Sequence, residues 1–245
     1  MLHRPSIDTQ RLINKEYLMK KIAALLIFTG ISAASAVQAQ SKFEGAYGQV
    51  GVGYENVNPS FSSSGLTVSG LGTLPINTSV SNQGSFVGVI GAGYMAGLTK
   101  DFLLGLGVEY SPFAGQSGNY SYGIAGVGTQ TGTYQKQNSY NVFLSPATPI
   151  GQDGLLYGKV GFTGASIKAT ESGSSSTTNY TGYSLGLGYK QLISGGLYAF
   201  GEVNYANYGN QTNTYSGVVS GHTYSYSNTS SANAINGLVG IGYKF

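Results

Sequence analysis

The stretch Phe102-Leu-Leu-Gly-Leu-Gly-Val-Glu-Tyr110 alternates between two kinds of residue. Every second position is apolar: Phe102, Leu104, Leu106, Val108 and Tyr110. The positions between them hold Leu103, two glycines and Glu109. Successive side chains of a β-strand point to opposite faces, so this pattern predicts a strand with one apolar face and one small or polar face.

The same alternation recurs along the chain and predicts eight strands. The eight apolar rows lie at about 46–54, 86–94, 102–110, 140–144, 156–162, 183–189, 197–205 and 235–245. Short connections are predicted at about 96–101, 148–154 and 191–196. Long polar loops are predicted at about 57–83, 112–137, 165–180 and 207–232. Eight antiparallel strands with short turns at one end and long loops at the other indicate an up-and-down barrel.

Composition decides which face of the barrel points outward. Charged residues are 9% of the chain, against about 25% in ordinary soluble domains. A soluble barrel would show water a charged exterior, whereas the second face here is mostly Gly, Ser and Asn. We therefore expect the apolar rows to face lipid, with closure satisfying the backbone polar groups of every strand.

Two sets of residues follow from this inverted arrangement. Aromatic residues that end the apolar rows are predicted to form interfacial girdles: Tyr54, Tyr94, Tyr110, Tyr140, Tyr189 and Tyr205. Glu109, Lys159 and Glu202 are predicted to face the lumen from three different strands. They could form a polar constriction that admits ions or small solutes, or an ion-pair network that fills the lumen. Strand number favours the filled lumen, because eight strands enclose little more than their own side chains.

Residues 1–39 are predicted to be a leader with a cleavable signal peptide. Met19-Lys-Lys is followed by an apolar run at 22–28 and by Val37-Gln-Ala39, the pattern of a secretory signal, with Met19 as the preferred true start. The barrel domain is then 40–245. The leader carries five basic and two acidic residues, which account for the net charge of +3, and seven lysines balance seven acids in 40–245. Without a basic patch, nucleic-acid binding is not expected.

The mature chain, from Phe43 to Phe245, resembles the small eight-stranded outer-membrane β-barrels of Gram-negative bacteria, the superfamily of the OmpA transmembrane domain and the opacity-type proteins. The most specific element is Ile241-Gly-Tyr243-Lys-Phe245, which ends in an aromatic residue. In that superfamily such an ending, here Ile241, Tyr243 and Phe245, is read by the barrel-assembly machinery. The resemblance implies export to the outer membrane and contact with its lipid and lipopolysaccharide.

The fold alone leaves the function open, because it carries adhesins, structural proteins, lipid enzymes and narrow channels. The predicted loops combine Tyr with Ser, Gly and Asn, as in Tyr215-Ser-Gly217, a mixture typical of adaptable contact surfaces. We therefore expect a non-enzymatic structural or surface-interaction role with extracellular ligands bound through loops. The alternative is a narrow porin-like channel for ions or small solutes.

A third hypothesis, an outer-membrane lipid hydrolase, rests on His222. A catalytic histidine needs a neighbouring nucleophile and usually an orienting acid. The predicted loop around His222 holds Ser and Thr but no acid, and Glu171 is distant in sequence. The chain also has no Cys and no metal-ligand spacing, so we expect no enzyme, cofactor or metal site. Gly91-Ala-Gly93-Tyr-Met-Ala96 fits a dinucleotide fingerprint, but no crossover helix fits between it and the next strand.

Overall fold

A computed structural model describes residues 41–124 and 126–245, which belong to one compact unit spanning Ser41–Phe245. The predicted leader and signal peptide, 1–39, lie outside the described residues. All secondary-structure elements in the described part are β-strands. No described helix is long and apolar enough to cross a membrane.

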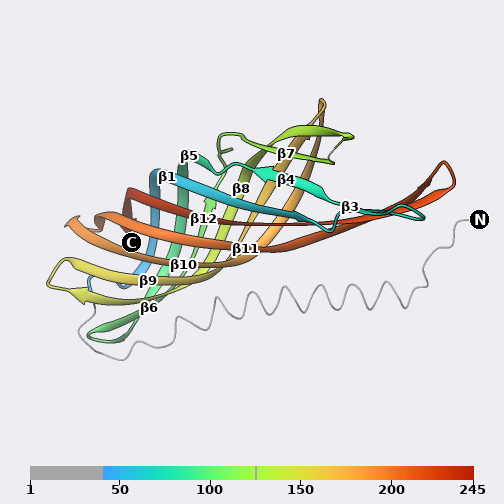
Figure 1. Cartoon of the computed structure of the whole chain (residues 1–245). Coiled ribbons are helices and arrows are strands. Elements are labelled where there is room, and N and C mark those ends of the chain that lie inside the picture. Colours follow the sequence, from blue (N-terminus) through green and yellow to red (C-terminus); the bar gives the residue numbers. More distant parts are fainter. Residues whose placement is uncertain (1–40, 125) are drawn as a thin grey trace, which may run out of the picture. The chain divides into compact units, whose positions relative to one another are not determined.

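Eight long strands form a closed antiparallel ring (Figure 1). Each pairs with the next long strand in the chain, and the last pairs with the first along Tyr47–Ser63. The eight strands are β1 (Gly45–Ser63), β5 (Gln83–Thr99), β6 (Phe102–Ser111), β8 (Gly128–Ile150), β9 (Gly154–Glu171), β10 (Ser174–Ser194), β11 (Leu197–Val219) and β12 (His222–Lys244). The predicted all-β antiparallel barrel is confirmed.

The apolar rows lie on the outside of the ring. Val52 is 65% exposed and Val203 is 60% exposed, whereas Glu109, Lys159 and Glu202 are buried. A water-soluble barrel would have the opposite arrangement, because burial of apolar side chains is what stabilises a soluble core. The outer surface of the ring is therefore suited to lipid.

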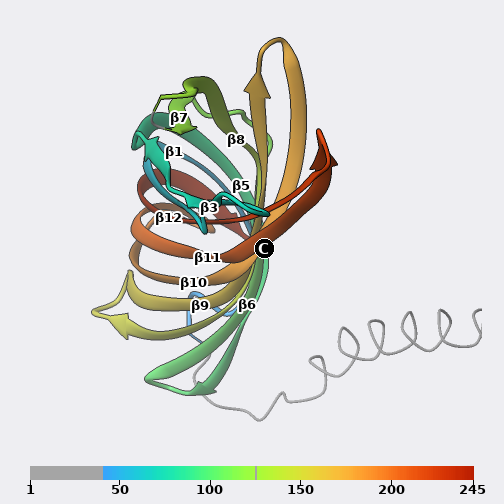
Figure 2. The ribbon, with the colours of Figure 1, turned by 45° about the vertical axis from the view of Figure 1, so that its right-hand side comes forward.

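The two ends of the ring differ in length. At one end, called here the turn end, β5 and β6 are joined by Lys100-Asp101, β8 and β9 by residues 151–153, and β10 and β11 by Gly195-Gly196. At the other end, the hairpin end, the strands continue well beyond the apolar rows. Figures 1 and 2 show the β9–β10 and β11–β12 hairpins extending from the ring in different directions.

The prediction that the polar segments 165–180 and 207–232 are loops is therefore wrong. These regions are β-hairpins, each closed by a two-residue turn, Ser172-Gly173 and Ser220-Gly221. All four turn residues have positive φ, between 46° and 82°, which is the type I′ geometry that suits the twist of paired strands. Strands outside a membrane need no apolar face, so their polar sequences lack the alternation on which the prediction relied.

The other two predicted loops, 57–83 and 112–137, are also largely paired strands. They contain four short strands: β2 (Leu66–Val68), β3 (Gly72–Leu74), β4 (Ile76–Val80) and β7 (Gly118–Ile124). β2 pairs with β12 and β3, whereas β4 pairs with β7, which pairs with β8. The segment between β1 and β5 is thereby attached to two different parts of the hairpin end.

Candidate functional site

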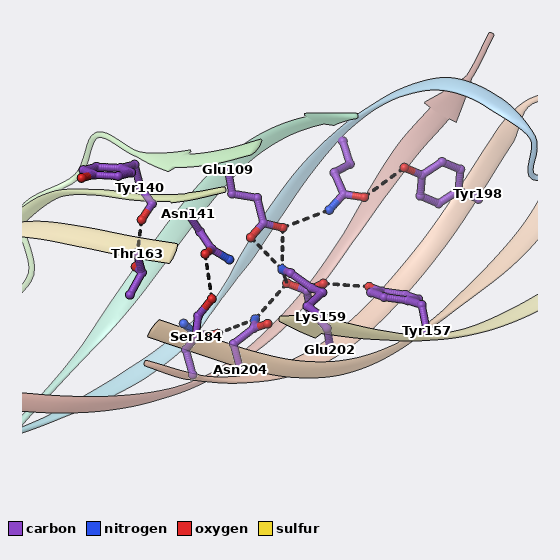
Figure 3. Close-up of polar contacts among 12 residues, drawn as sticks. Glu109, Tyr140, Asn141, Tyr157, Lys159, Thr163, Ser184, Tyr198, Glu202 and Asn204 are labelled. Atoms are coloured by element: carbon purple, nitrogen blue, oxygen red, sulfur yellow. Dashed lines mark hydrogen bonds and ion pairs between the residues drawn. The ribbon is translucent and has the colours of Figure 1, made fainter. Parts of the chain in front are cut away.

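The three predicted lumen residues meet inside the ring (Figure 3). Lys159 Nζ lies 2.8 and 2.6 Å from the two carboxylate oxygens of Glu109 and 3.0 Å from Oε1 of Glu202. All three side chains are at most 9% exposed. Charged groups removed from water to this degree must be paired, because an isolated buried charge costs several kcal/mol.

Neighbouring polar groups complete the coordination of this triad. Tyr157 donates its hydroxyl to Glu202 Oε2 at 2.7 Å, and Asn204 Nδ2 donates to Oε1 at 2.9 Å. Gln49 Nε2 donates to Glu109 Oε1 at 3.4 Å. The lumen is narrow here: a Cβ at Gly91 would lie 3.1 Å from Cγ of Glu109.

The sequence analysis missed a second ion pair, Lys136 with Glu55, whose Nζ and Oε2 lie 2.7 Å apart. Lys136 lies within a predicted loop, and Glu55 immediately follows the first apolar row. The pairing register of β8 shifts between Gln137 and Tyr140. Strict alternation from Tyr140, which faces out, would also place Lys136 outside. The bulge reverses the side and places Lys136 in the lumen.

A third lysine, Lys190, directly follows Tyr189, the last residue of an apolar row, so alternation places it on the inner face. Its Nζ lies 3.8 Å from the ring centroid of Tyr47 and 4.7 Å from that of Tyr198. Such contacts stabilise a cation through the ring quadrupole. The buried charged residues of the described lumen are therefore three lysines and three glutamates.

Apolar clusters lie on both sides of the Glu109–Lys159–Glu202 triad. Near the turn end, a buried cluster is formed by Phe43, Met95, Leu103, Ala147, Leu155 and Tyr157, drawn from four strands and the segment before β1. Toward the hairpin end, a second cluster contains Val57, Ala165, Tyr208 and Ala234. Between the triad and this second layer lies a polar cavity of about 60 Å³. Side chains therefore occupy much of the lumen at both of these levels.

Beyond the second layer, the inward faces of the extended strands surround a wider cavity of about 310 Å³, called here the vestibule. Its position follows from register, because Phe61 lies four residues beyond Val57 along β1. Its lining residues are Phe61, Leu66, Ile76, Tyr122, Gly123, Ile124, Val127, Gly128, Gln130, Tyr226 and Asn228. No candidate residue was predicted here, because the sequence analysis treated these segments as loops.

The predicted girdle residues lie on the outer face, in two groups. Tyr54, Tyr110 and Tyr140 lie toward the hairpin end, with the ring of Tyr54 5.7 Å from that of Phe86. Tyr205 lies in the same group but is half-buried, with its ring 6.5 Å from that of Tyr183. Tyr94 and Tyr189 lie toward the turn end.

The carboxy-terminal residues Ile241, Tyr243 and Phe245 are exposed on the same side of the chain as the apolar row of β12. The rings of Tyr243 and Phe245 are 5.3 Å apart, edge to face. The backbone N–H of Phe245 donates to the carbonyl of Ala46, at 2.9 Å, so the end of the chain is tied to β1.

Among the described residues, no carboxylate forms a hydrogen bond or ion pair with His222. Its Nδ1 lies 2.9 Å from the carbonyl oxygen of Ser69. Glu171 instead accepts hydrogen bonds from Tyr122, at 2.7 Å, and Tyr120, at 3.3 Å. Within the described residues, no group of three or more His, Cys, Asp or Glu side chains could hold a metal ion.

Comparison with known proteins identifies one family and several similar structures. The family model described as outer membrane protein beta-barrel domain matches residues 23–245. The structure resembles that of the outer membrane protein OprG from Pseudomonas aeruginosa, with a TM-score of 0.53 and 16% identity over 85% of this chain and 99% of that chain. At this identity the likeness concerns the fold alone.

Two further similar structures have lower TM-scores. Ail, the attachment invasion locus protein of Yersinia pestis, is 14% identical, with a TM-score of 0.39 over 82% of this chain and 99% of that chain. Neisserial surface protein A is also 14% identical, with a TM-score of 0.43 over 82% of this chain and 97% of that chain. No curated protein matches the sequence.

Proposed function

Because the chain belongs to the outer membrane protein beta-barrel domain family, and is therefore a protein of the outer membrane, we propose that it acts there as a non-conducting, non-enzymatic barrel that presents its hairpin end for surface interaction. In barrels of this membrane the short turns face the periplasm and the longer connections face outward. The hairpin end is then extracellular, and the turn end, with the carboxy terminus, is periplasmic.

The packing of side chains within the lumen is the observation that carries the proposal. An ion crossing the barrel would have to pass the layer of Met95, Leu103 and Leu155 and then displace Lys159 from two glutamates. Separating Lys159 from its partners leaves buried charges uncompensated, at a cost of several kcal/mol. This arrangement favours a structural plug over the alternative of a narrow channel.

The hairpin end has the composition and reach of a contact surface. From Tyr208 to Val219, β11 extends about 35 Å beyond the second apolar layer, at about 3.3 Å per residue. Residues 207–231 contain four tyrosines and no Asp, Glu, Lys or Arg. Tyrosine rings combined with small hydrogen-bonding residues form adaptable contacts at little cost in side-chain entropy.

The same proposal gives roles to the outer face. The two groups of aromatic residues would lie at the two membrane interfaces, in contact with lipid and lipopolysaccharide. Ile241, Tyr243 and Phe245 would be read by the barrel-assembly machinery before β12 closes on β1. Replacing Phe245 by Ser should then lower the folded, heat-modifiable fraction in the outer membrane, whereas Lys244→Ser should leave that fraction unchanged.

Two measurements test the proposal itself. In planar bilayers with 1 M KCl, we expect the purified protein to give no single-channel steps. Cells that display the barrel should be retained on immobilised glycans or matrix proteins, and replacing 209–231 by a two-residue turn should abolish this retention. A reproducible single-channel conductance would contradict the closed lumen. Unchanged retention of cells with the shortened hairpin would contradict the surface role.

A matched control separates loss of binding from loss of assembly. The β9–β10 hairpin can be shortened at 168–177, which leaves the β11–β12 hairpin intact. Both shortened proteins should keep the difference in gel mobility between boiled and unboiled samples that folded outer-membrane barrels show. If both lose retention equally, the surface role does not lie in the β11–β12 hairpin.

A further inference from the structure

We propose that the vestibule is a blind binding site for a neutral, mainly apolar small molecule with one or two hydrogen-bonding groups. This site is separate from the outward contact surface of the hairpins, because it lies on their inward faces. Its volume of about 310 Å³ is at the lower end of the range of ligand pockets in proteins, about 300–1,000 Å³.

The wall of the vestibule is mainly apolar. Aliphatic and aromatic side chains reach it from several strands, among them Phe61 of β1, Leu66 of β2, and Ile76 of β4. Ile124 of β7, which pairs directly with Ile76, and Val127 of the β7–β8 turn also contribute. Apolar residues that gather in one concave surface indicate a binding site rather than a solvated loop.

The chemistry of the lining excludes a charged ligand. No Asp, Glu, Lys, Arg or His lines the cavity. Glu171, which is hydrogen-bonded to the lining residue Tyr122, does not itself line the cavity and also accepts from the hydroxyl of Tyr120. A charged molecule entering this cavity would lose its hydration without gaining a counter-charge, which is unfavourable.

Polar groups for orienting a ligand are nevertheless available. Gln130, Asn228 and the hydroxyl of Tyr226 line the cavity, and no hydrogen bond from these three groups to any described residue is present. A few such groups in an otherwise apolar pocket are what fix the orientation of a small molecule. The ring of Tyr226 is itself held by stacking on Tyr215, with centroids 4.9 Å apart.

The walls are held in place by hydrogen bonds on both sides. Thr78 Oγ1 donates to the carbonyl of Phe61 at 3.2 Å, which ties β4 to β1. The N–H of Ser64 donates to the carbonyl of Ser227 at 2.9 Å, which ties the β1–β2 connection to β12. Below the vestibule lies the layer of Val57, Ala165, Tyr208 and Ala234. These side chains separate the vestibule from the ion pairs of the lumen.

The absence of tryptophan from the sequence allows a direct test of where a ligand binds. Val127→Trp places a single indole at the vestibule, and Val219→Trp places one at the tip of β11, outside it. The probe is N-phenyl-1-naphthylamine, a neutral fluorophore that accepts energy from tryptophan, added to the full chain in phospholipid nanodiscs. We expect saturable energy transfer from the indole at 127 and only a non-saturable background from the indole at 219.

Polar substitutions in the wall provide the second measurement. In the Val127→Trp protein, Ile76→Gln with Ile124→Gln should weaken probe binding at least about tenfold, because each removes apolar contact within a small pocket. The matched pair Val218→Gln with Val219→Gln, outside the vestibule, should leave binding within about twofold. An anionic analogue, 8-anilinonaphthalene-1-sulfonate, should bind at least about tenfold more weakly than the neutral probe.

Several outcomes would overturn the proposal. One is equal energy transfer from the indoles at 127 and 219. Another is equal probe affinity of the two proteins that carry glutamine pairs. A third is tighter binding of the anionic analogue than of the neutral probe. Loss of probe binding on adding lipopolysaccharide would make a lipid acyl chain the occupant. Binding that appears only when the protein dimerises would make the site an interface between copies. None of these outcomes depends on conductance or cell retention, so this site and the proposed surface role can fail independently.

Discussion

The lumen and the vestibule share the strands β1, β8 and β12, yet they use opposite chemistry. The lumen holds three lysines and three glutamates packed against one another, with Lys159 in contact with two carboxylates. The vestibule, a few residues further along the same strands, has no charged side chain in its lining. The charged region has satisfied its own hydrogen bonds, whereas the uncharged region leaves polar groups free for another molecule.

This contrast separates stability from recognition. A fully paired internal network can bind nothing without first breaking, so its contribution is to hold the ring together. An apolar cavity at the rim can accept a ligand without such a cost. Substitutions in the lumen should therefore change unfolding, and substitutions at the hairpin end should change binding, with little overlap.

The largest expected effect is that of Lys159→Met, which leaves Glu109 and Glu202 buried without a cation. The free energy of unfolding should fall by about 3–5 kcal/mol, measured by urea titration in lipid vesicles with gel mobility as the readout. Lys100→Met is the control, because Lys100 is 78% exposed at a turn and should change stability by less than about 0.5 kcal/mol.

A compensated variant sharpens this prediction. Replacing the whole triad, Lys159→Met with Glu109→Gln and Glu202→Gln, removes the charges together. Most of the loss should then be recovered, because apolar or neutral replacement of a complete buried ion pair is often close to neutral. If the single and triple variants are equally unstable, the cost is one of packing rather than of uncompensated charge.

The next largest effect concerns the apolar layer at the turn end. Leu103 is 0% exposed, so Leu103→Ala should leave a cavity and lower the free energy of unfolding by about 3 kcal/mol. Leu187→Ala, on the lipid-facing side, should cost less, because lipid fills the space that the side chain vacates. An equal loss for both leucines would mean that the lumen at this level is not closely packed.

Much of this contrast could be predicted from alternation alone. The period-two alternation predicts where the eight strands lie and that their apolar rows face outward. It also predicts that Glu109, Lys159, Glu202 and Lys190 lie on the inner face. Glu55 lies one residue beyond the first predicted strand, and continuing the alternation of that strand places its side chain on the inner face. Lys136 could not be assigned in this way, because the bulge before Tyr140, where Asn138 has a φ of 46°, reverses the side on which residues lie.

The vestibule was missed for a different physical reason. Its residues belong to strands whose outward faces meet water, so their sequences carry no apolar row to reveal them. The signals that could have found them are the turns Ser172-Gly173 and Ser220-Gly221, since Ser-Gly pairs are common in tight turns. Which segments pair across the hairpin end, such as β2 with β12 and β4 with β7, depends on contacts between residues distant in sequence, which one sequence does not disclose.

A smaller effect is expected at the border of the vestibule, where Tyr122 donates to Glu171. Burial, together with this hydrogen bond and the carboxylate charge, raises the pKa of Tyr122 from 10.0 to about 12. A tyrosine whose pKa is higher in the folded state stabilises the fold below pH 10, and this contribution is lost as the pH rises from 10 to about 12. Glu171→Gln should therefore lower the pKa of Tyr122, but not fully to 10.0, because burial remains.

Absorbance at 295 nm measures this titration in the folded protein. Subtracting the titration curve of the Glu171→Gln, Tyr122→Phe double variant from that of the Glu171→Gln variant isolates the phenol of Tyr122 among the 20 tyrosines. The pKa of Tyr134, also raised to about 12 but by burial alone, should not move and serves as the internal control. An unchanged pKa for Tyr122 would mean that burial alone determines it and that Glu171 is not held as the hydrogen-bond distances indicate.

The smallest effect is expected for His222→Ala. The imidazole is exposed at the start of β12, and its one side-chain hydrogen bond among the described residues is with the carbonyl oxygen of Ser69. The backbone pairing of Ser69 N–H with the carbonyl of Thr223 survives the substitution, so stability should change by less than about 0.5 kcal/mol. The lipid composition of cells that produce the variant should match that of wild type, because no acid is positioned to orient the ring as a general base. A change in lipid acylation without a change in stability would contradict the non-enzymatic role. It would place a catalytic group at the hairpin end, where the contrast with the charged lumen predicts only binding.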